Sequence, residues 1–398
     1  MKIFFYRVFQ WIMKVASGLL YWPKPILLEG ENSTLKIPKY LNDQGIKSVL
    51  LVTDKGITSL GLTTPLLKEL ENACIQCIVF DETVPNPTIG NIEDALKVYH
   101  ANDARAIIAF GGGSSMDCAK GVGARVSNPN KSIPQMRGLL KVTRRIPLLI
   151  AVPTTAGTGS ETTIAAVISN PETHEKYAVN DQKLTPHVAV LDPLLTVGLP
   201  PHITSTTGLD ALTHAVEAYI GRSNTAETRQ AAQEAVKLIH ENLFQAYTNG
   251  KDLKARQNML KASFLAGVAF TRAYVGYVHA LAHTLGGYYG VPHGLANAIL
   301  LPVVLDYFGS SVDQPLAELA DLIGIAQTTD TRSQKAAKFI QWIKDLETSM
   351  NIPTRVDCIK EDDLDGMIRN ALREANPLYP VPRELFAEDL RKLYKQIS

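Results

Sequence analysis

The sequence has few cysteines, no excess of either charge and no long uninterrupted apolar run. Four cysteines in 398 residues cannot build a disulfide framework, which indicates a reducing compartment. Forty Lys and Arg residues balance 39 Asp and Glu residues, so the net charge of +1 gives no indication of nucleic-acid binding. With 45% hydrophobic and 20% charged residues, the composition excludes a disordered, collagen-like or coiled-coil chain. The length suggests two or three domains.

Acidic residues are absent from the first 22 positions, which carry Lys2, Arg7 and Lys14 and hence a charge of +3. Arg7, Gln10 and Lys14 fall on one face of a helix, and apolar side chains fall on the other. The charges interrupt the segment too often for a transmembrane span or a signal peptide. Residues 1–22 are therefore predicted to form an amphipathic helix, which either lies on a membrane surface or packs on its own domain or across a dimer.

Between residues 23 and 197, short apolar runs alternate with helical stretches. Five of these runs are predicted to be strands, at residues 48–53, 77–80, 104–110, 147–152 and 188–191. Strands separated by helices imply right-handed crossovers and a parallel sheet with helices on both faces. From about residue 200 helical periodicity dominates. We therefore expect three parts: a helical extension at 1–22, an α/β domain at 23–197 and an all-helical domain at 198–398.

Two glycine-rich loops follow predicted strands. The loop at 111–115 leads into a helix, and backbone N–H groups at such a helix N-terminus favour a pyrophosphate, although the sequence is not GxGxxG. The loop at 154–160 follows the next strand, and ligands of open α/β sheets bind beyond strand carboxyl ends. Asp54 ends the first predicted strand, where a carboxylate can accept hydrogen bonds from ribose and repel a 2′-phosphate. Asp54 thus favours NAD over NADP, unless it only caps the next helix.

Two segments of the helical half carry side chains four residues apart. Asp210 and His214 share one face of a predicted helix, as do His279 and His283, and His293 follows. Three imidazoles and one carboxylate suit Fe²⁺ or Zn²⁺. The spacing leaves open which of His279, His283 and His293 complete a metal site, and any one of them alone could be structural.

These segments resemble the iron-containing (group III) alcohol dehydrogenase family. The resemblance rests on GGGSSMD at 111–117, PTTAGTGSE at 153–161, GLDALTHAVEAY at 208–219 and HALAHTLGGYYGVPHGLANAILLP at 279–302, with minor matches at 85–88 and 376–377. It extends from about Trp22 to the C-terminus. It implies an N-terminal α/β dinucleotide-binding domain with a parallel sheet and an all-helical, metal-binding C-terminal domain. The implied activity is a metal-dependent, NAD-linked alcohol dehydrogenase or aldehyde reductase, acting as a homo-oligomer.

The resemblance also implies a set of site residues. The metal ligands fall on Asp210, His214, His279 and His293, and His283 matches a histidine near the substrate, a candidate proton relay. The resemblance gives as candidate cofactor-binding residues Gly112, Gly113, Ser114, Asp117, Thr154, Thr155, Thr158 and Lys176, with Asn86 in the minor match at 85–88. Asp54, at the end of the first predicted strand, completes the candidates. The resemblance implies NAD or NADP together with Fe²⁺ or Zn²⁺, and Asp54 favours NAD over NADP.

The sequence departs from its family at residues 1–22, at the large Arg272, Tyr274 and Tyr277, and at Thr284. The two tyrosines either narrow the pocket or line a longer apolar channel. With an amphipathic N-terminal helix, they suggest a substrate that partitions into lipid, such as a long-chain alcohol. We expect a cytoplasmic enzyme with peripheral membrane contact through residues 1–22.

Other activities remain as alternatives at this point. They are a hydroxyacid–oxoacid transhydrogenase, for which Arg272 could bind a carboxylate, a short-chain alcohol or diol dehydrogenase, a dehydroquinate synthase-type lyase, and a non-enzymatic membrane or scaffold protein. The filled ligand positions argue against the last of these.

Overall fold

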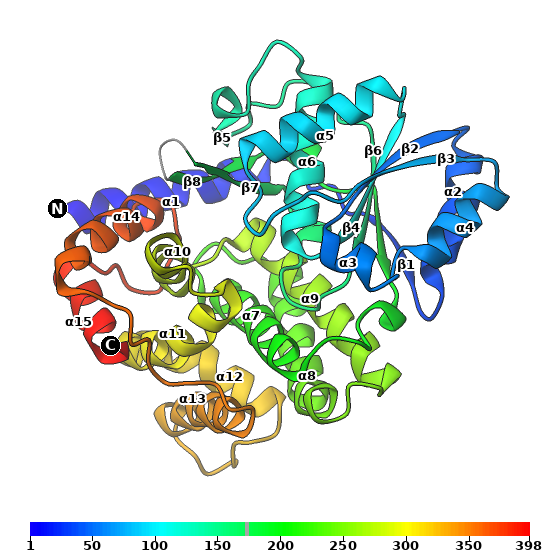
Figure 1. Cartoon of the computed structure of the whole chain (residues 1–398). Helices are drawn as coiled ribbons and strands as arrows, with labels where there is room; N and C mark the ends of the chain where they lie inside the picture. The colour runs from blue at the N-terminus through cyan, green and yellow to red at the C-terminus, as the bar shows by residue number, and fades with distance from the viewer. Residues whose placement is uncertain (172–174) are drawn as a thin grey trace. The chain divides into compact units, whose positions relative to one another are not determined.

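The computed structural model describes residues 1–171 and 175–398, and the chain divides into two compact units. One unit comprises Tyr21–Gly198 and contains the β-sheets. The other comprises Met1–Leu20 together with Leu199–Ser398 and is helical (Figure 1). The predicted division treats residues 1–22 as a separate extension, whereas in the structure their helix packs within the helical unit.

Strands and helices alternate along the α/β unit. The strands are β1 (Ile26–Glu29), β2 (Ser48–Val52), β3 (Gln76–Phe80), β4 (Ala106–Gly111), β5 (Gly138–Leu139), β6 (Leu148–Pro153), β7 (Ala165–Asn170), β8 (Glu175–Asn180) and β9 (Val188–Leu191). The helices are α2 (Ile37–Asp43), α3 (Lys55–Ser59), α4 (Thr64–Asn72), α5 (Ile89–Ala101) and α6 (Gly113–Ser127).

The main sheet has six parallel strands in the order β1-β9-β6-β4-β2-β3. The five predicted strands are its five consecutive members from β9 to β3. The apolar runs of β2, β4, β6 and β9 reflect burial between helices on both faces, whereas β3 is an edge strand and only partly buried. The prediction missed β1, an edge strand whose residues are mostly exposed. It also missed β5, β7 and β8, which form a separate three-stranded sheet.

The strand order reverses at β2. This strand pairs with β3 on one side and with β4 on the other, so the chain crosses over it between β3 and β4. Ligands of open α/β sheets bind beyond the strand carboxyl ends at such a switch point. Asp54 follows β2 and the glycine loop follows β4, so the two candidate cofactor-binding segments flank this position.

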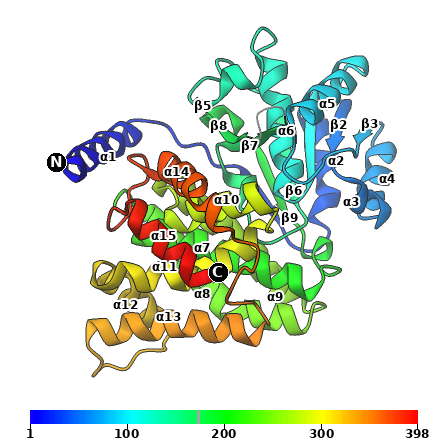
Figure 2. The same cartoon turned by 60° about the vertical axis from the view of Figure 1, so that its left-hand side comes forward.

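The helical unit is built around α7, which is buried almost throughout. Its helices are α1 (Lys2–Gly18), α7 (Pro201–Ile220), α8 (Ala226–Thr248), α9 (Leu253–Ala273), α10 (Tyr277–Tyr289), α11 (His293–Phe308), α12 (Asp313–Leu322), α13 (Arg332–Ser349), α14 (Leu364–Ala375) and α15 (Ala387–Ile397). Every residue of α7 from Gly208 to Ile220 is buried, because α8, α9 and α11 pack around it (Figure 2).

One apolar stretch of the described chain, His293–Leu322, has the length and hydropathy of a membrane span. However, 61% of its most apolar part is buried inside the protein. This stretch therefore packs largely in the core of the helical unit.

A buried carboxyl on α13 makes stability depend on pH. Burial raises the pKa of Glu347 to about 8, and its Oε1 atom has no hydrogen-bond partner within the described residues. Between the ordinary pKa of a glutamate, which applies in the unfolded chain, and pH 8, the folded state keeps a proton on Glu347 that the unfolded state loses. The free energy of unfolding therefore falls as pH rises through this range. From pH 5 to pH 8, the free energy of unfolding should fall by up to about 3 kcal/mol more in wild type than in Glu347→Gln. Urea unfolding at both pH values measures it. Equal losses in the two proteins would contradict this assignment.

Candidate functional site

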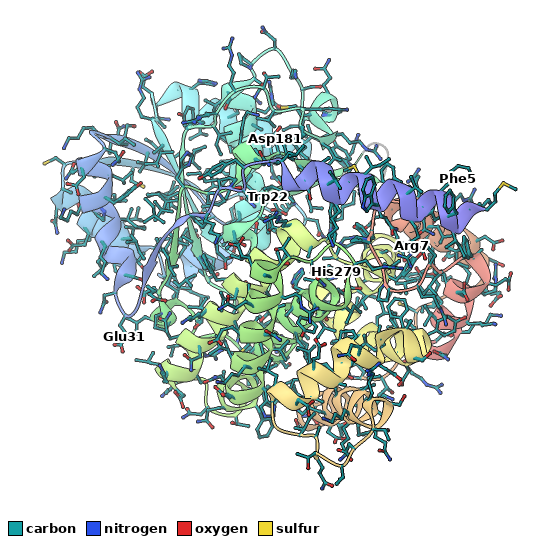
Figure 3. The ribbon with its side chains drawn as sticks, turned by 180° about the vertical axis from the view of Figure 1, so that it is seen from behind. Phe5, Arg7, Trp22, Glu31, Asp181 and His279 are labelled. Carbon is teal, nitrogen blue, oxygen red and sulfur yellow. The ribbon has the colours of Figure 1, made fainter. Side chains whose placement is uncertain are left out.

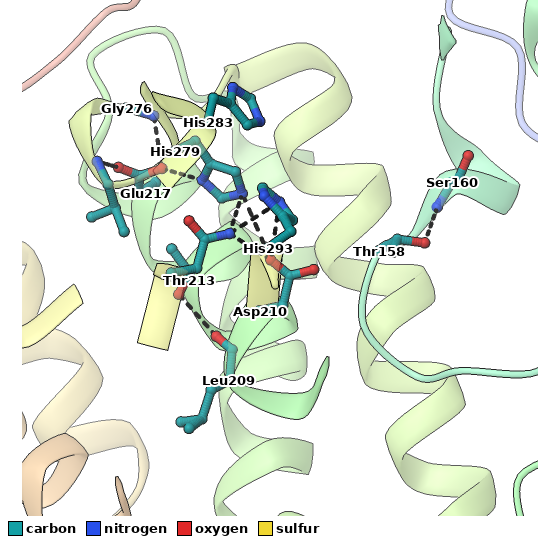
Figure 4. A network of polar contacts seen from close by, with 12 residues as sticks. Thr158, Ser160, Leu209, Asp210, Thr213, Glu217, Gly276, His279, His283 and His293 are labelled. Carbon is teal, nitrogen blue, oxygen red and sulfur yellow. Dashed lines mark hydrogen bonds and ion pairs between the residues drawn. The ribbon is translucent and has the colours of Figure 1, made fainter. Parts of the chain in front are cut away.

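Four side chains from three helices converge in the helical unit. Asp210 and His214 lie on α7, His279 lies on α10, and His293 is the first residue of α11. One ligand atom from each lies within 4.8 Å of the others. Figure 4 shows Asp210, His279 and His293 directed toward one another. Asp210, His214 and His279 are buried and His293 is partly exposed, so the cluster is accessible from the His293 side.

Asn297, one helical turn after His293, shows that the cluster suits a cation. Its Nδ2 group donates to Asp210 Oδ1 at 2.6 Å and lies 3.2 Å from His279 Nε2 and 3.1 Å from His293 Nε2. Three atoms with lone pairs, Asp210 Oδ1, His279 Nε2 and His293 Nε2, thus surround the Asn297 NH₂ group, whose hydrogens are positively polarised. Asn297 Oδ1 is buried without a hydrogen-bond partner among the described residues. Three imidazoles and one carboxylate fit Fe²⁺ or Zn²⁺.

The local electrostatics keep His279 in the form that binds a metal. Burial, and then the neighbouring His214, His293 and His283, hold the pKa of His279 well below its usual value. The His214 and His279 ring centroids are 4.4 Å apart. Neutral imidazole is the form that coordinates a metal, so this histidine is available without losing a proton.

Glu217, on the same face of α7, positions His279. Its carboxyl lies 2.6 Å from His279 Nδ1 and accepts hydrogen bonds from the backbone N–H groups of Gly276 and Val278 at 2.8 and 2.7 Å (Figure 4). Burial raises the pKa of Glu217 to about 8, and hydrogen bonds from the backbone N–H groups of Gly276, Val278 and His279 oppose the rise. A Cβ atom on Gly276 would lie 2.7 Å from Glu217 Oε1, so only glycine permits this approach. Such carboxylates fix the orientation and tautomer of a metal-binding imidazole.

His283 has its own carboxylate partner. Its Nδ1 atom lies 2.7 Å from Glu374 Oε1, to which the Tyr379 hydroxyl also donates at 2.8 Å. The His283 ring stacks on His293 with centroids 5.1 Å apart and is 28% exposed. With Nδ1 bound to the carboxylate, Nε2 is the ring nitrogen that can exchange a proton.

The N-terminus of α6 carries the first group of candidate cofactor residues. Gly112 caps this helix and Gly113 is its first residue. Gly111 has a φ of +150°, and a Cβ atom there would lie 2.5 Å from Ser115 Oγ, so the turn requires glycine. The exposed N–H groups of this helix end favour an anion.

Three further candidates meet beside this helix end. Ser114 Oγ accepts a hydrogen bond from the Asn86 backbone N–H at 3.1 Å, and Lys176 Nζ donates to Asn86 Oδ1 at 2.7 Å. The structure thus brings together residues that are up to 90 positions apart in the chain. A lysine ammonium near a helix N-terminus suits a phosphate group.

Asp117 contributes to holding the second glycine loop. It accepts a hydrogen bond from Ser160 Oγ at 3.2 Å, while the buried Lys120 donates to Ser160 O at 2.7 Å and to Thr163 Oγ1 at 2.7 Å. Burial raises the pKa of Asp117 to about 6 and lowers that of Lys120 to about 8. The contacts of Asp117 in the structure are therefore within the protein, with Ser160 of this loop and with the backbone N–H of Val167 on β7.

The three candidate threonines line the same loop. Thr154 donates its backbone N–H to Gly111 O at 3.0 Å, which ties the loop to the end of β4. Thr158 Oγ1 accepts from the Ser160 backbone N–H at 3.3 Å (Figure 4). A Cβ atom on Gly112 would lie 3.5 Å from Thr155 Oγ1, so the two glycine-rich loops are in contact.

Asp54 lies at the switch point and caps a helix as well. Its Oδ1 atom accepts a hydrogen bond from the Ile57 N–H at 3.1 Å at the start of α3. Its Oδ2 atom faces Gly111, where an added Cβ would lie 3.7 Å away. The capping role is thus observed, and the carboxylate is also beside the loop proposed to bind the cofactor.

The large residues before His279 have structural contacts. Tyr277 is fully buried, and its hydroxyl donates to Asn376 Oδ1 at 2.6 Å and accepts from the Leu385 N–H at 2.9 Å. Arg272 Nη1 lies 3.8 Å from Glu227 Oε2. Tyr274 is half-buried with a φ of +67°. Tyr277 therefore anchors the core of the helical unit.

Sequence reasoning missed Glu217, Asn297, Glu374 and Lys120. Glu217 follows His214 by three residues and Asn297 follows His293 by four, so helical spacing contained a signal for both. No comparable signal links Glu374 to His283, because they lie on different helices 91 residues apart.

Known proteins resemble the chain along nearly its whole length. A model described as "Iron-containing alcohol dehydrogenase" matches residues 24–193, and one described as "Fe-containing alcohol dehydrogenase family, C-terminal" matches residues 204–398. The chain is 38% identical over 395 residues to the 1,3-propanediol dehydrogenase of Klebsiella pneumoniae, covering 98% of this chain and 99% of that protein. It is 32% identical to the NAD-dependent methanol dehydrogenase of Bacillus methanolicus, covering 93% and 97%.

A solved structure agrees with these matches. The crystal structure of a 1,3-propanediol oxidoreductase superposes with a TM-score of 0.92 at 37% identity, covering 96% of this chain and 100% of that one. The first 23 residues lie outside both family models, whereas the alignment with the Klebsiella protein covers enough of the chain to include part of them.

Proposed function

The chain belongs to the iron-containing alcohol dehydrogenase family and is an NAD-dependent alcohol dehydrogenase. We propose that its substrates are long-chain primary alcohols and their aldehydes. The observation that carries the dehydrogenase activity is the convergence of Asp210, His214, His279 and His293 within 4.8 Å. These four residues would hold Fe²⁺ or Zn²⁺.

Each part of the chemistry is supported by residues of this chain. When bound, the metal supplies Lewis acidity to an alcohol or aldehyde oxygen, and the nicotinamide supplies the hydride acceptor or donor. Glu217 orients His279. His283 takes up at Nε2 the proton that the alcohol releases, and Glu374, bound at Nδ1, stabilises the resulting positive charge.

The cofactor would be held by the α/β unit. The N-terminus of α6, with Gly112, Gly113 and Ser114, would bind the pyrophosphate, with Lys176 adding a positive charge. Thr154, Thr155 and Thr158 shape the facing loop.

The long-chain preference rests on the exposed apolar side chains of α1, which suit a substrate that partitions into lipid. It is tested by measuring kcat/KM with NAD for ethanol through hexadecanol on metal-loaded full-length protein. We expect an increase of at least about tenfold from short to long chains, as each buried methylene adds binding energy. A preference for two- to four-carbon alcohols would instead favour a short-chain alcohol or diol dehydrogenase.

The transhydrogenase alternative requires a basic group for a carboxylate substrate. Arg272 already lies beside the Glu227 carboxylate, which argues against its serving as that group. Release of free NADH during alcohol oxidation would distinguish a dehydrogenase from a transhydrogenase.

Asp54 provides a test of the NAD preference. Asn in its place can still accept the Ile57 N–H through Oδ1 but carries no charge to repel a 2′-phosphate. We expect Asp54→Asn to raise kcat/KM for NADP by about tenfold with little change for NAD. Steady-state kinetics with both cofactors measures this, and an unchanged ratio of the two values would assign Asp54 to capping only.

We also propose that the enzyme is a cytoplasmic homo-oligomer with peripheral membrane contact through residues 1–22. The four cysteines are free thiols, in keeping with a reducing compartment.

A further inference from the structure

Helix α1 attaches to the helical unit through its polar face. Arg7 donates to Val381 O at 2.7 Å and Pro382 O at 2.9 Å and pairs with the buried Glu384 carboxylate at 2.6 Å. Gln10, the single buried residue of α1, donates to the backbone carbonyls of the 377–379 segment, and Lys14 donates to Arg222 O at 3.0 Å. We call Arg7, Gln10 and Lys14 the polar clamp. Figure 3 shows Arg7 directed toward the helical unit and Phe5 directed away from it.

Most apolar residues of α1, and Leu19 at its C-terminal cap, are exposed. Phe4, Trp11 and Leu19 are 68%, 65% and 85% exposed. With Val8 and Val15 they recur every three or four residues and form one stripe along the helix, which we call the apolar stripe. A surface helix ordinarily turns its apolar stripe toward the core and its charges toward water. In α1 the polar clamp faces the protein, so the apolar stripe requires a partner outside the described contacts.

The charge of α1 identifies that partner as an anionic surface. Residues 1–22 carry +3, and the first acidic residue of the chain is Glu29. Arg7 is paired with Glu384, so the exposed Lys2 and Lys14 carry the charge that an anionic surface would meet. Two copies of this chain joined through the apolar stripe would bring two such cationic helices together. An anionic bilayer instead accommodates the apolar stripe among its acyl chains, with Trp11 at the interface, while the exposed Lys2 and Lys14 attract its headgroups.

We infer that the apolar stripe of α1 binds the surface of an anionic lipid bilayer, with the helix lying in the interface while the polar clamp keeps it on the enzyme. This deepens the membrane contact proposed above by naming the face and the lipid charge. It does not depend on the substrate, because binding is measured without any alcohol.

Flotation of the full-length protein with vesicles tests the inference. The vesicles are phosphatidylcholine with or without phosphatidylglycerol, at low and at physiological salt. Wild type should float with the anionic vesicles, less so at higher salt. The Trp11→Ser/Leu19→Ser variant should bind them at least about tenfold more weakly, because it loses two of the largest exposed apolar side chains.

Phe244→Ser/Leu322→Ser is the matched control, since it removes one exposed aromatic and one exposed leucine elsewhere on the helical unit. The control should float like wild type, and all three proteins should retain equal kcat on a water-soluble alcohol without lipid. The inference is overturned if wild type does not float or if both variants bind alike. It is also overturned if Trp11→Ser/Leu19→Ser breaks up a lipid-free oligomer while wild type ignores vesicles, since a second copy would then cover the apolar stripe.

Discussion

Replacement of His279 by alanine is expected to remove the bound metal and at least about 10³-fold of kcat/KM, because Lewis acidity supplies several kcal/mol of transition-state stabilisation. His279 contributes one of four donor atoms, and its Nε2 faces both Asp210 and the amide of Asn297. Metal content by elemental analysis and kcat/KM with NAD measure the two losses on the same preparation.

An exposed histidine on α7 provides the control for this experiment. His202→Ala removes an imidazole at the N-terminal end of the helix that carries Asp210 and His214, and both metal content and activity should stay at the wild-type level. Full activity in metal-free His279→Ala protein would contradict the assigned metal site.

Glu217→Gln is expected to weaken metal binding by about 10- to 100-fold, the usual effect of removing a partner of a metal-binding histidine. The carboxylate contacts three nitrogen atoms with its two oxygens. A glutamine must turn its NH₂ group toward one of them, which leaves a buried donor unpaired and His279 poorly oriented. Competition with a chelator measures the affinity.

If Glu217 acts by positioning His279, kcat should also respond differently in the two variants. Once saturated with metal, Glu217→Gln should recover most of its kcat, whereas His279→Ala should not. Glu347→Gln removes another buried carboxyl of the same unit, on a helix without candidate ligands, and should bind metal like wild type. A Glu217→Gln protein with unchanged affinity would show that His279 is held by packing alone.

The inner strands of the central sheet could be predicted because they are buried on both faces. Val49, Leu50 and Leu51 of β2 are fully buried, and such continuous apolar runs are recognisable without knowledge of their neighbours. The edge strand β1 is mostly exposed and β8 mixes polar with apolar residues, whereas β7 overlaps the apolar run at 164–168, a signal that the prediction missed. The strand conformation of these segments depends on pairing, of β1 with β9 and of β7 with β8. Such pairing leaves little signal in the local sequence.

The site could be predicted in part for a similar reason. Asp210 and His214 lie on one helix, and so do His279 and His283, so four-residue spacing identified them as candidates. The contact of Glu374 with His283 depends on how α14 packs against α10, which the local sequence does not specify.

The N-terminal helix was predicted correctly as amphipathic, yet periodicity alone could not say which face would meet the protein. Two hydrogen bonds and a buried ion pair at Arg7, with further contacts from Gln10 and Lys14, decide this in the structure. Such contacts depend on carbonyls and a carboxylate supplied by residues more than 200 positions away.

The acceptors of the polar clamp indicate how similar N-terminal helices could be recognised in related enzymes and grafted onto them. Apart from Glu384, its acceptors outside α1 are main-chain carbonyl oxygens, which every amino acid provides. The contacts with α1 therefore place no demand on the side chains of residues 222, 377, 379, 381 and 382, which provide only their carbonyl oxygens. Comparable helices in related enzymes should be sought by a polar triplet at i, i+3 and i+7 within an otherwise apolar N-terminus. A protein engineer could graft the first 20 residues onto a relative that keeps the same backbone path and an acid at the position of Glu384.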